Sequence, residues 1–117
     1  MPMLYLITDN ILFSSKILAN LKANDIETAS FTAPALLRAA ITKQSPVCVL
    51  ANLNARTYDA IALVKELKAD GLAVVAFCGH ADVATREAGI AAGADKVIAN
   101  SAITMNAAGA LKDAGVL

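Results

Sequence analysis

Four side chains that could take part in chemistry fall where the sequence predicts strands to end: Asp9, Asn52, Cys78 and Asn100. The carboxyl ends of parallel strands share one edge of an α/β sheet, and sites are built at that edge. This set holds one carboxylate, two amides and one thiol. It holds no pair of acids and no nucleophile with an orienting base, so we expect no catalytic residues and no enzyme activity.

Cys78 is the side chain in this set with the greatest potential reactivity. It is predicted on a loop beside Gly79 and His80 and just before a helix start, and both features could lower its pKa. A Cys78-based redox sensor or thiol enzyme is therefore one hypothesis, although His80 is the only histidine and no third residue orients it. Cys48 is predicted in the core, and two cysteines are too few for a disulfide framework or a zinc site.

An alternation of short apolar runs and helical periodicity must position these residues. It predicts a single doubly wound, five-stranded parallel sheet with helices on both faces, an α/β fold. The predicted strands cover residues 3–8, 26–31, 47–51, 72–77 and 96–99, and the predicted helices cover 13–23, 34–44, 58–69, 83–92 and 102–113.

The composition excludes several classes of protein. Ten basic and ten acidic residues balance, and without a basic run we expect no nucleic-acid partner. Apolar runs stop well short of a membrane span and the first residues do not read as a signal peptide, so we expect no membrane contact and a cytoplasmic location. The hydrophobic fraction of 57% and mean hydropathy of +0.58 indicate some apolar surface for a partner.

Several motifs together resemble the receiver domain of two-component response regulators (CheY-like). They are the acidic strand end Asp9-Asn10, the strand–loop–helix from Val49 to Lys65 with Asp59-Ala60 opening the helix, and the loops Gly79 to Asp82 and Ala92 to Asp95. The resemblance covers essentially residues 1–117. It implies a flavodoxin-like fold with strand order 2-1-3-4-5, forming one receiver-like domain with no output domain.

The resemblance also implies a degenerate phosphoacceptor pocket, formed by Asp9, Asn10, Asn52, Cys78 and Asn100. Asn52 stands where the family carries its phosphoacceptor aspartate, Cys78 replaces the hydroxyl residue, and Asn100 replaces the lysine. Magnesium prefers anionic oxygen ligands, and an amide is a far poorer nucleophile than a carboxylate. We therefore predict a pseudo-receiver with no metal and no cofactor.

The first functional hypothesis is a non-phosphorylatable signalling domain that acts through protein–protein interaction. The partner would be another signalling protein or a second copy of the chain. As in receivers, a homodimer would use the fourth helix, fifth strand and fifth helix, where Ile90, Ala91, Met105 and Ala108 are candidates for the interface. The alternative is a small-molecule or nucleotide-binding domain that uses the same strand edge, although the segment TDNILFSS after the first strand has no glycine for a phosphate loop.

Other readings stay open at this stage. Asp9 could be a residual metal ligand or a carboxylate that accepts hydrogen bonds from loop amides. Asn10, Asn52 and Asn100 could form a neutral hydrogen-bonded cluster or bind a small polar ligand. Residues 11–13 could contact an apolar partner or be buried, and the last two helices could form an interface or simply pack on the sheet.

Overall fold

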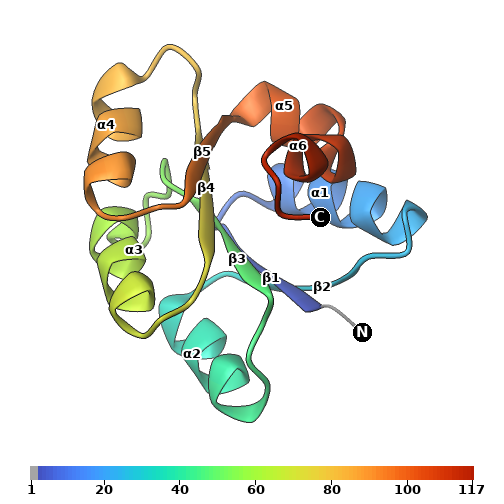
Figure 1. Cartoon of the computed structure of the whole chain (residues 1–117), viewed down its shortest axis with the longest axis horizontal. Helices are drawn as coiled ribbons and strands as arrows, with labels where there is room; N and C mark the ends of the chain where they lie inside the picture. Colours follow the sequence, from blue (N-terminus) through green and yellow to red (C-terminus); the bar gives the residue numbers. More distant parts are fainter. Residues whose placement is uncertain (1–2) are drawn as a thin grey trace.

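The computed structural model describes residues 3–117 and contains one five-stranded parallel sheet in the order β2-β1-β3-β4-β5 (Figure 1). All four strand pairs are parallel. The fold class and strand order predicted from the sequence are confirmed. The strands are β1 (Met3–Ile7), β2 (Glu27–Phe31), β3 (Cys48–Asn52), β4 (Val74–Cys78) and β5 (Lys96–Ala99).

Helices cover both faces of this sheet. The chain moves from β1 to β2 in one direction and from β2 to β3, β4 and β5 in the other, and right-handed crossovers in opposite directions place their helices on opposite faces. Two separate hydrophobic clusters mark the two faces. On one face lie α1 (Ile11–Ala23), α5 (Asn100–Met105) and α6 (Ala107–Asp113), and on the other α2 (Pro34–Lys43), α3 (Ala60–Ala69) and α4 (Val83–Ala91) (Figure 1).

Within residues 3–117, no helix has the length and apolar character needed to cross a membrane.

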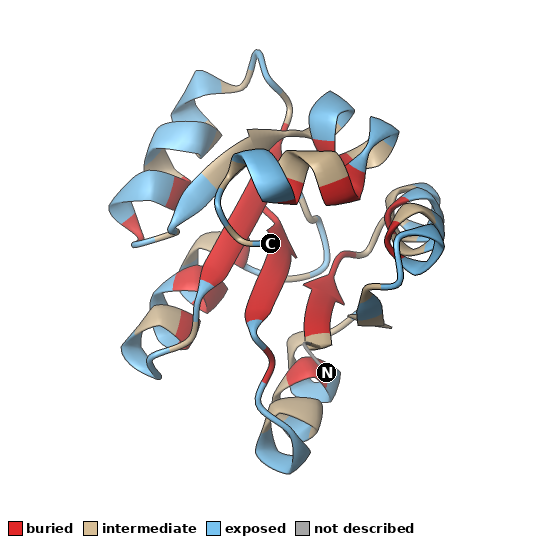
Figure 2. Cartoon of the chain, turned by 45° about the vertical axis from the view of Figure 1, so that its right-hand side comes forward, coloured by how far each residue is buried: buried red, intermediate tan, exposed pale blue. Residues whose placement is uncertain are grey.

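The central strands β3 and β4 form the middle of the core, and every residue in them is buried (Figure 2). Side chains of a strand alternate between the two faces of the sheet. Thus Leu50 packs with the α1 side of the molecule, whereas Val49 and Ala51 pack with the α2–α3 side. A strand covered on both faces must be apolar throughout, which explains the continuous run that the sequence shows there.

The final predicted helix, over residues 102–113, is wrong as a single element. The structure has two short helices that meet at Asn106, whose backbone is not helical (φ −154°, ψ 81°). The Asn106 side chain caps α6, because its Oδ1 accepts a hydrogen bond from the Gly109 amide at 3.0 Å. The first of the two helices also begins at once after β5, at Asn100, which places that side chain at the edge of the sheet.

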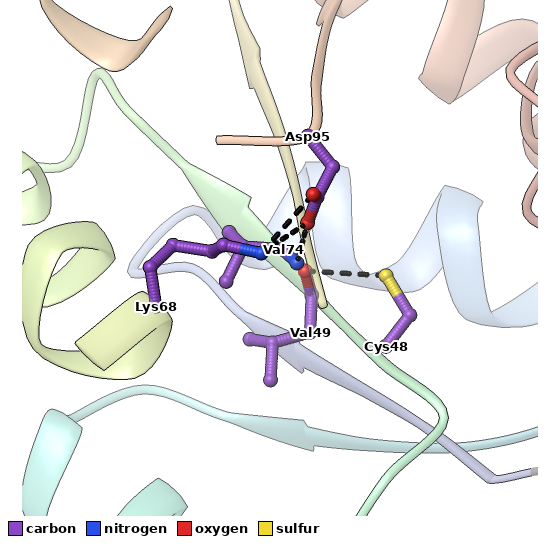
Figure 3. Close-up of polar contacts among 5 residues, drawn as sticks. All are labelled: Cys48, Val49, Lys68, Val74 and Asp95. Carbon is purple, nitrogen blue, oxygen red and sulfur yellow. Dashed lines mark hydrogen bonds and ion pairs between the residues drawn. The ribbon is translucent and has the colours of Figure 1, made fainter. Parts of the chain in front are cut away.

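An ion pair fixes the opposite, amino-terminal end of the sheet (Figure 3). Lys68 of α3 reaches Asp95, with its Nζ 2.9 Å from Oδ2, and the same oxygen accepts a hydrogen bond from the Val74 amide at 2.8 Å. Cys48 lies beside this group and its Sγ donates to the Val49 carbonyl at 3.6 Å. At this end of the sheet these polar groups bond to one another, and the candidate site lies at the opposite, carboxyl end of the strands.

Candidate functional site at the carboxyl edge of the sheet

A pocket of about 470 Å³ opens at the carboxyl edge of the strands. Four of the five residues predicted for the site lie in it, and Cys78 does not. The pocket is lined by Asp9, Asn10, Phe13, Asn52, Asn54, Arg56 and Asn100. The topology produces this convergence, since the loops after β1 and β3 and the start of α5 after β5 all leave the same edge.

Asn52 forms the floor of the pocket and is only 2% exposed. Its Nδ2 donates to the Thr8 hydroxyl at 3.0 Å, and its Oδ1 accepts a hydrogen bond from the Asn54 amide at 2.9 Å. Both ends of the amide are therefore engaged, as a buried polar group requires. These contacts hold the side chain in one orientation.

Asp9 holds the loop that follows β3. Its Oδ2 accepts hydrogen bonds from the Arg56 amide at 2.7 Å, the Thr57 amide at 3.0 Å and the Thr57 hydroxyl at 3.2 Å. Desolvation alone would raise the pKa of Asp9, but these hydrogen bonds hold it below its usual range. The structure thus supports the reading of Asp9 as an acceptor for loop amides.

Asn10 caps the first helix, because its Oδ1 accepts a hydrogen bond from the Phe13 amide at 3.1 Å. Its own backbone amide donates to the Thr8 hydroxyl at 3.0 Å. The three asparagines therefore do not bond to one another as the predicted cluster would. Instead the Thr8 hydroxyl accepts hydrogen bonds from both Asn10 and Asn52. Thr8 is only 1% exposed and was not among the predicted site residues.

Asn100 contributes the least satisfied group in the pocket. Its Oδ1 is buried and has no hydrogen-bond partner among the described residues. At the first position of α5 its side chain lines the same pocket as Asn10 and Asn52.

Asn54, which was not among the predicted site residues, joins two loops. Its Oδ1 accepts a hydrogen bond from the Gly79 amide at 2.9 Å, and its Nδ2 donates to Asp82 at 3.0 Å. Asp82 in turn caps α4 by accepting a hydrogen bond from the Thr85 amide at 3.2 Å. The loop after β3 and the start of α4 are consequently held together at the rim of the pocket.

Two further pocket residues, Phe13 and Arg56, were not predicted as site residues. Phe13 is one of the residues 11–13 expected either to contact an apolar partner or to be buried, and its partly exposed ring forms part of the pocket wall. Arg56 lies in the loop four residues after Asn52, and a basic residue there is the signal that could have marked it. Its guanidinium forms no ion pair within residues 3–117.

The prediction for Cys78 was wrong in its physical setting. The residue is the last of β4 and is 2% exposed, not part of an open loop. Burial first, and the Asp82 carboxylate second, raise the pKa of its thiol. His80 is exposed in the following turn, and no hydrogen bond joins it to Cys78 in the described part of the chain.

Three of the four predicted interface residues are exposed. Ile90 is 54% and Met105 82% exposed, and Ala91 is also open to solvent. Ala108 is the exception, since it is 2% exposed and its amide donates to Asn20 of α1 at 2.8 Å. The break at Asn106 turns Ala108 inward, so it belongs to the core.

No group of three or more His, Cys, Asp or Glu side chains within residues 3–117 comes together to hold a metal ion. Asp9 is the only carboxylate that lines the pocket. A hard divalent cation is bound mainly by anionic oxygen ligands, and one carboxylate supplies little of that charge.

Protein-family models give no match to this chain, and neither do curated proteins. Solved structures do. NtrX from Brucella abortus has a TM-score of 0.80 and 22% identity over 99% of this chain, which spans only 28% of the NtrX chain. Its separate receiver domain has a TM-score of 0.77 and 23% identity, and covers 93% of this chain and 98% of that one. A response regulator receiver domain from Clostridium thermocellum has a TM-score of 0.81 and 16% identity, over 97% and 94% of the two chains.

The chain has the receiver fold. The described elements β1 to α6 reproduce the flavodoxin-like arrangement of these structures from the first strand to the last helix. At identities of 16% to 23% the similarity establishes this fold and leaves the chemistry to be argued from the residues of the pocket.

Proposed function

We propose that the chain is a signalling domain of receiver type that takes no phosphoryl group and acts through contact with a protein. The observation that carries the proposal is Asn52. It occupies the position that the sequence resemblance assigns to the phosphoacceptor, and there it is a buried amide whose two ends are both hydrogen-bonded. An amide in this state offers no carboxylate oxygen to a phosphodonor.

The loop amides around the pocket support the same proposal. The amides of Arg56 and Thr57 donate to Asp9, and that of Asn54 donates to Asn52. The amide of Gly79 donates to the Asn54 side chain. A phosphoryl group is normally held by such amides and by cations. Here the protein's own side chains already accept these hydrogen bonds, which favours one fixed conformation of the edge.

The contact surface that we propose crosses the edge strand β5. Ile90 on α4 and Met105 on α5 are large apolar side chains open to solvent on the two helices that flank this strand. Ala91 adds a small apolar contact on α4. A second copy of the chain or another signalling protein would bury these side chains. Ile11 and Leu12, at 74% and 72% exposed, offer a separate apolar contact at the start of α1.

The phosphoryl part of the proposal is tested by incubating the protein with acetyl phosphate and Mg²⁺ and measuring its intact mass. We expect no phosphoryl adduct on the native chain. The matched variant is Asn52→Asp, which restores a carboxylate but leaves Asn10 and Asn100 in place, and we expect little labelling of it as well. A phosphoryl adduct on the native chain that maps to the pocket would refute the proposal.

The contact part is tested by substitution at the proposed surface. Ile90→Glu and Met105→Glu place charges on it, whereas Leu36→Glu, at a residue 55% exposed on α2, is the matched control. Light scattering at high protein concentration and chemical cross-linking measure self-association. If the native chain forms a dimer or binds a signalling partner, we expect Ile90→Glu and Met105→Glu to weaken that association and Leu36→Glu to retain it. Equal association of all three variants would show that contact is made elsewhere.

The other hypotheses from the sequence are affected differently by the structure. A Cys78-based sensor is disfavoured because a buried thiol with a raised pKa is a poor nucleophile. A nucleotide phosphate would be bound by free amides at the start of a helix. At the start of α1 the Phe13 amide already donates its hydrogen bond to the Asn10 side chain, which disfavours a nucleotide. A small polar molecule in the pocket remains consistent with every contact described.

A further inference from the structure

The pocket at the carboxyl edge keeps several polar groups that the protein does not use. Oδ2 of Asp9 accepts three hydrogen bonds, but Oδ1 accepts none from the described residues. The amide of Asn100 has a buried oxygen without a partner. Nδ2 of Asn10 and the guanidinium of Arg56 are also without partners in residues 3–117. Of these groups, Arg56 is exposed and Asp9 and Asn10 are partly buried, whereas the Asn100 oxygen is fully buried. A buried polar atom is normally hydrogen-bonded, so the Asn100 oxygen indicates a polar occupant.

The charges of the pocket have a particular arrangement. Asp9 and Arg56 are the only ionised side chains that line it, and no ion pair joins them to each other or to another side chain in the described chain. The guanidinium is always charged, and the hydrogen bonds to Asp9 favour its ionised form. The site therefore presents one negative group, after β1, and one positive group, in the loop after β3, with no net charge.

This arrangement argues against several simple ligands. A phosphate dianion would meet the Asp9 carboxylate, and four of the loop amides that could bind it are already engaged by side chains. A divalent cation would find one carboxylate and a guanidinium that repels it. A neutral polyol would pair with neither the Asp9 carboxylate nor the Arg56 guanidinium.

A molecule that carries both charges avoids these penalties. An ammonium group can approach the free Oδ1 of Asp9, and a carboxylate can accept paired hydrogen bonds from the Arg56 guanidinium. The amides of Asn10 and Asn100 can bond to either group, because each offers both a donor and an acceptor. The ring of Phe13 forms an apolar wall for a side chain of the ligand.

We propose that this pocket binds a small zwitterion, with a free α-amino acid as its chemical class. The volume of about 470 Å³ accommodates such a molecule with its side chain or with accompanying water. Binding would fill the site from which the loops after β1 and β3 and the helix α5 diverge. Through the hydrogen bonds of Asn54 it would reach the start of α4. The proposal does not depend on the contact surface described above.

The first test is titration of the native protein with a panel of free α-amino acids, followed by calorimetry and by backbone amide NMR spectra. We expect at least one of them to bind with a Kd below about 1 mM. The shifted signals should centre on Phe13, Asn54 and Asn100. Inorganic phosphate and glycerol are the comparison ligands, and we expect neither to bind. If either binds at these residues while no amino acid does, the proposal is wrong.

The second test changes the ligand and so does not depend on the folding of any variant. For the best amino acid, its methyl ester lacks the carboxylate and its N-acetyl form lacks the ammonium group. We expect each analogue to bind at least about tenfold more weakly, because each leaves one charge of the pocket without a partner. Unchanged affinity of both analogues would show that charge pairing does not hold the ligand.

The third test assigns the charges to residues. Arg56→Gln and Asp9→Asn should each weaken binding about tenfold or more, and Asp9→Asn keeps an oxygen for the loop amides. Arg86→Gln, on the exposed surface of α4 and outside the pocket, is the matched control and should bind as the native protein does. If the control loses as much affinity as Arg56→Gln, the ligand lies elsewhere.

Discussion

Thr8 and Asn52 lie 44 residues apart in the sequence, and the hydroxyl of the first accepts a hydrogen bond of 3.0 Å from the side-chain amide of the second. Both residues are almost completely buried, at 1% and 2% exposed. The same hydroxyl accepts a hydrogen bond from the Asn10 amide at 3.0 Å. One side chain thus joins the ends of β1 and β3 to the start of α1, and this contact sets the shape of the pocket floor.

The first prediction concerns this hydroxyl. Thr8→Val keeps the shape of the side chain but leaves the Asn52 Nδ2 and the Asn10 amide without their acceptor. We expect a loss of about 1–3 kcal/mol in the free energy of unfolding, measured by urea denaturation. Thr28→Val on β2 is the control, because the Thr28 hydroxyl makes only a 3.4 Å contact to Ile26, and its effect should stay within about 0.5 kcal/mol. Equal losses would show that the Thr8 hydroxyl has no special role.

The sequence predicted the sheet well because alternating apolar runs and amphipathic helices report directly on burial. The continuous run from Cys48 to Ala51 could only be a strand covered on both faces. The predicted strand ends also placed Asp9, Asn52 and Asn100 at the same edge of the sheet, and in the structure these residues line one pocket.

Contacts made by loops could not be predicted in this way, because their residues carry no periodic signal. Thr8, Asn54 and Arg56 are short polar or charged residues after strands, and their roles depend on which distant amide they meet. Cys78 was misplaced for a related reason. A strand that extends one residue further than expected turns an apparent loop thiol into a buried one.

The second prediction concerns pH and the buried Cys48 thiol. Burial raises its pKa from 9.0 to about 11. The folded protein therefore keeps the proton that the unfolded chain releases between pH 9 and 11, so stability falls as pH rises through this range. The loss should be on the order of 2–3 kcal/mol.

The matched variant is Cys48→Ala, which should show a smaller fall over the same range in denaturation experiments at pH 8 to 11. Tyr58 titrates in the same direction, since burial and the Asp9 carboxylate raise its pKa, and its contribution is present in both proteins. An identical pH dependence of the native chain and the variant would contradict the prediction.

The third prediction concerns the close approach of α4 to Leu53, the residue directly after β3. A Cβ atom added at Gly89 would lie 2.5 Å from Cδ1 of Leu53, which is itself buried. Alanine is the better helix former by about 1 kcal/mol, yet we expect Gly89→Ala to destabilise the protein by about 1–3 kcal/mol because it overpacks this contact. Gly79→Ala, where a Cβ meets only the Asp82 Cβ at 4.0 Å, is the control and should be nearly neutral. A more stable Gly89→Ala variant would show that α4 can move away from Leu53 without cost.

The last prediction separates two roles of Asp95, which accepts a hydrogen bond from the buried Val74 amide and pairs with Lys68 (Figure 3). The ion pair is partly exposed to solvent, so Lys68→Gln should cost less than about 1 kcal/mol. Asp95→Ala removes the acceptor of the Val74 amide and should cost about 1–3 kcal/mol, with Asp95→Asn between the two.

The pH dependence of these variants gives an independent check. Partial burial alone would raise the pKa of Asp95, but the Val74 amide and Lys68 hold it below 3.8. Its contribution is therefore present above that pH and is lost as the pH falls below it, because the unfolded chain takes up the proton first. Urea denaturation at pH 7 and pH 3 should show that the difference between the native chain and Asp95→Asn shrinks in acid. A difference that stays constant would assign the stabilisation to the shape of the side chain and not to its charge.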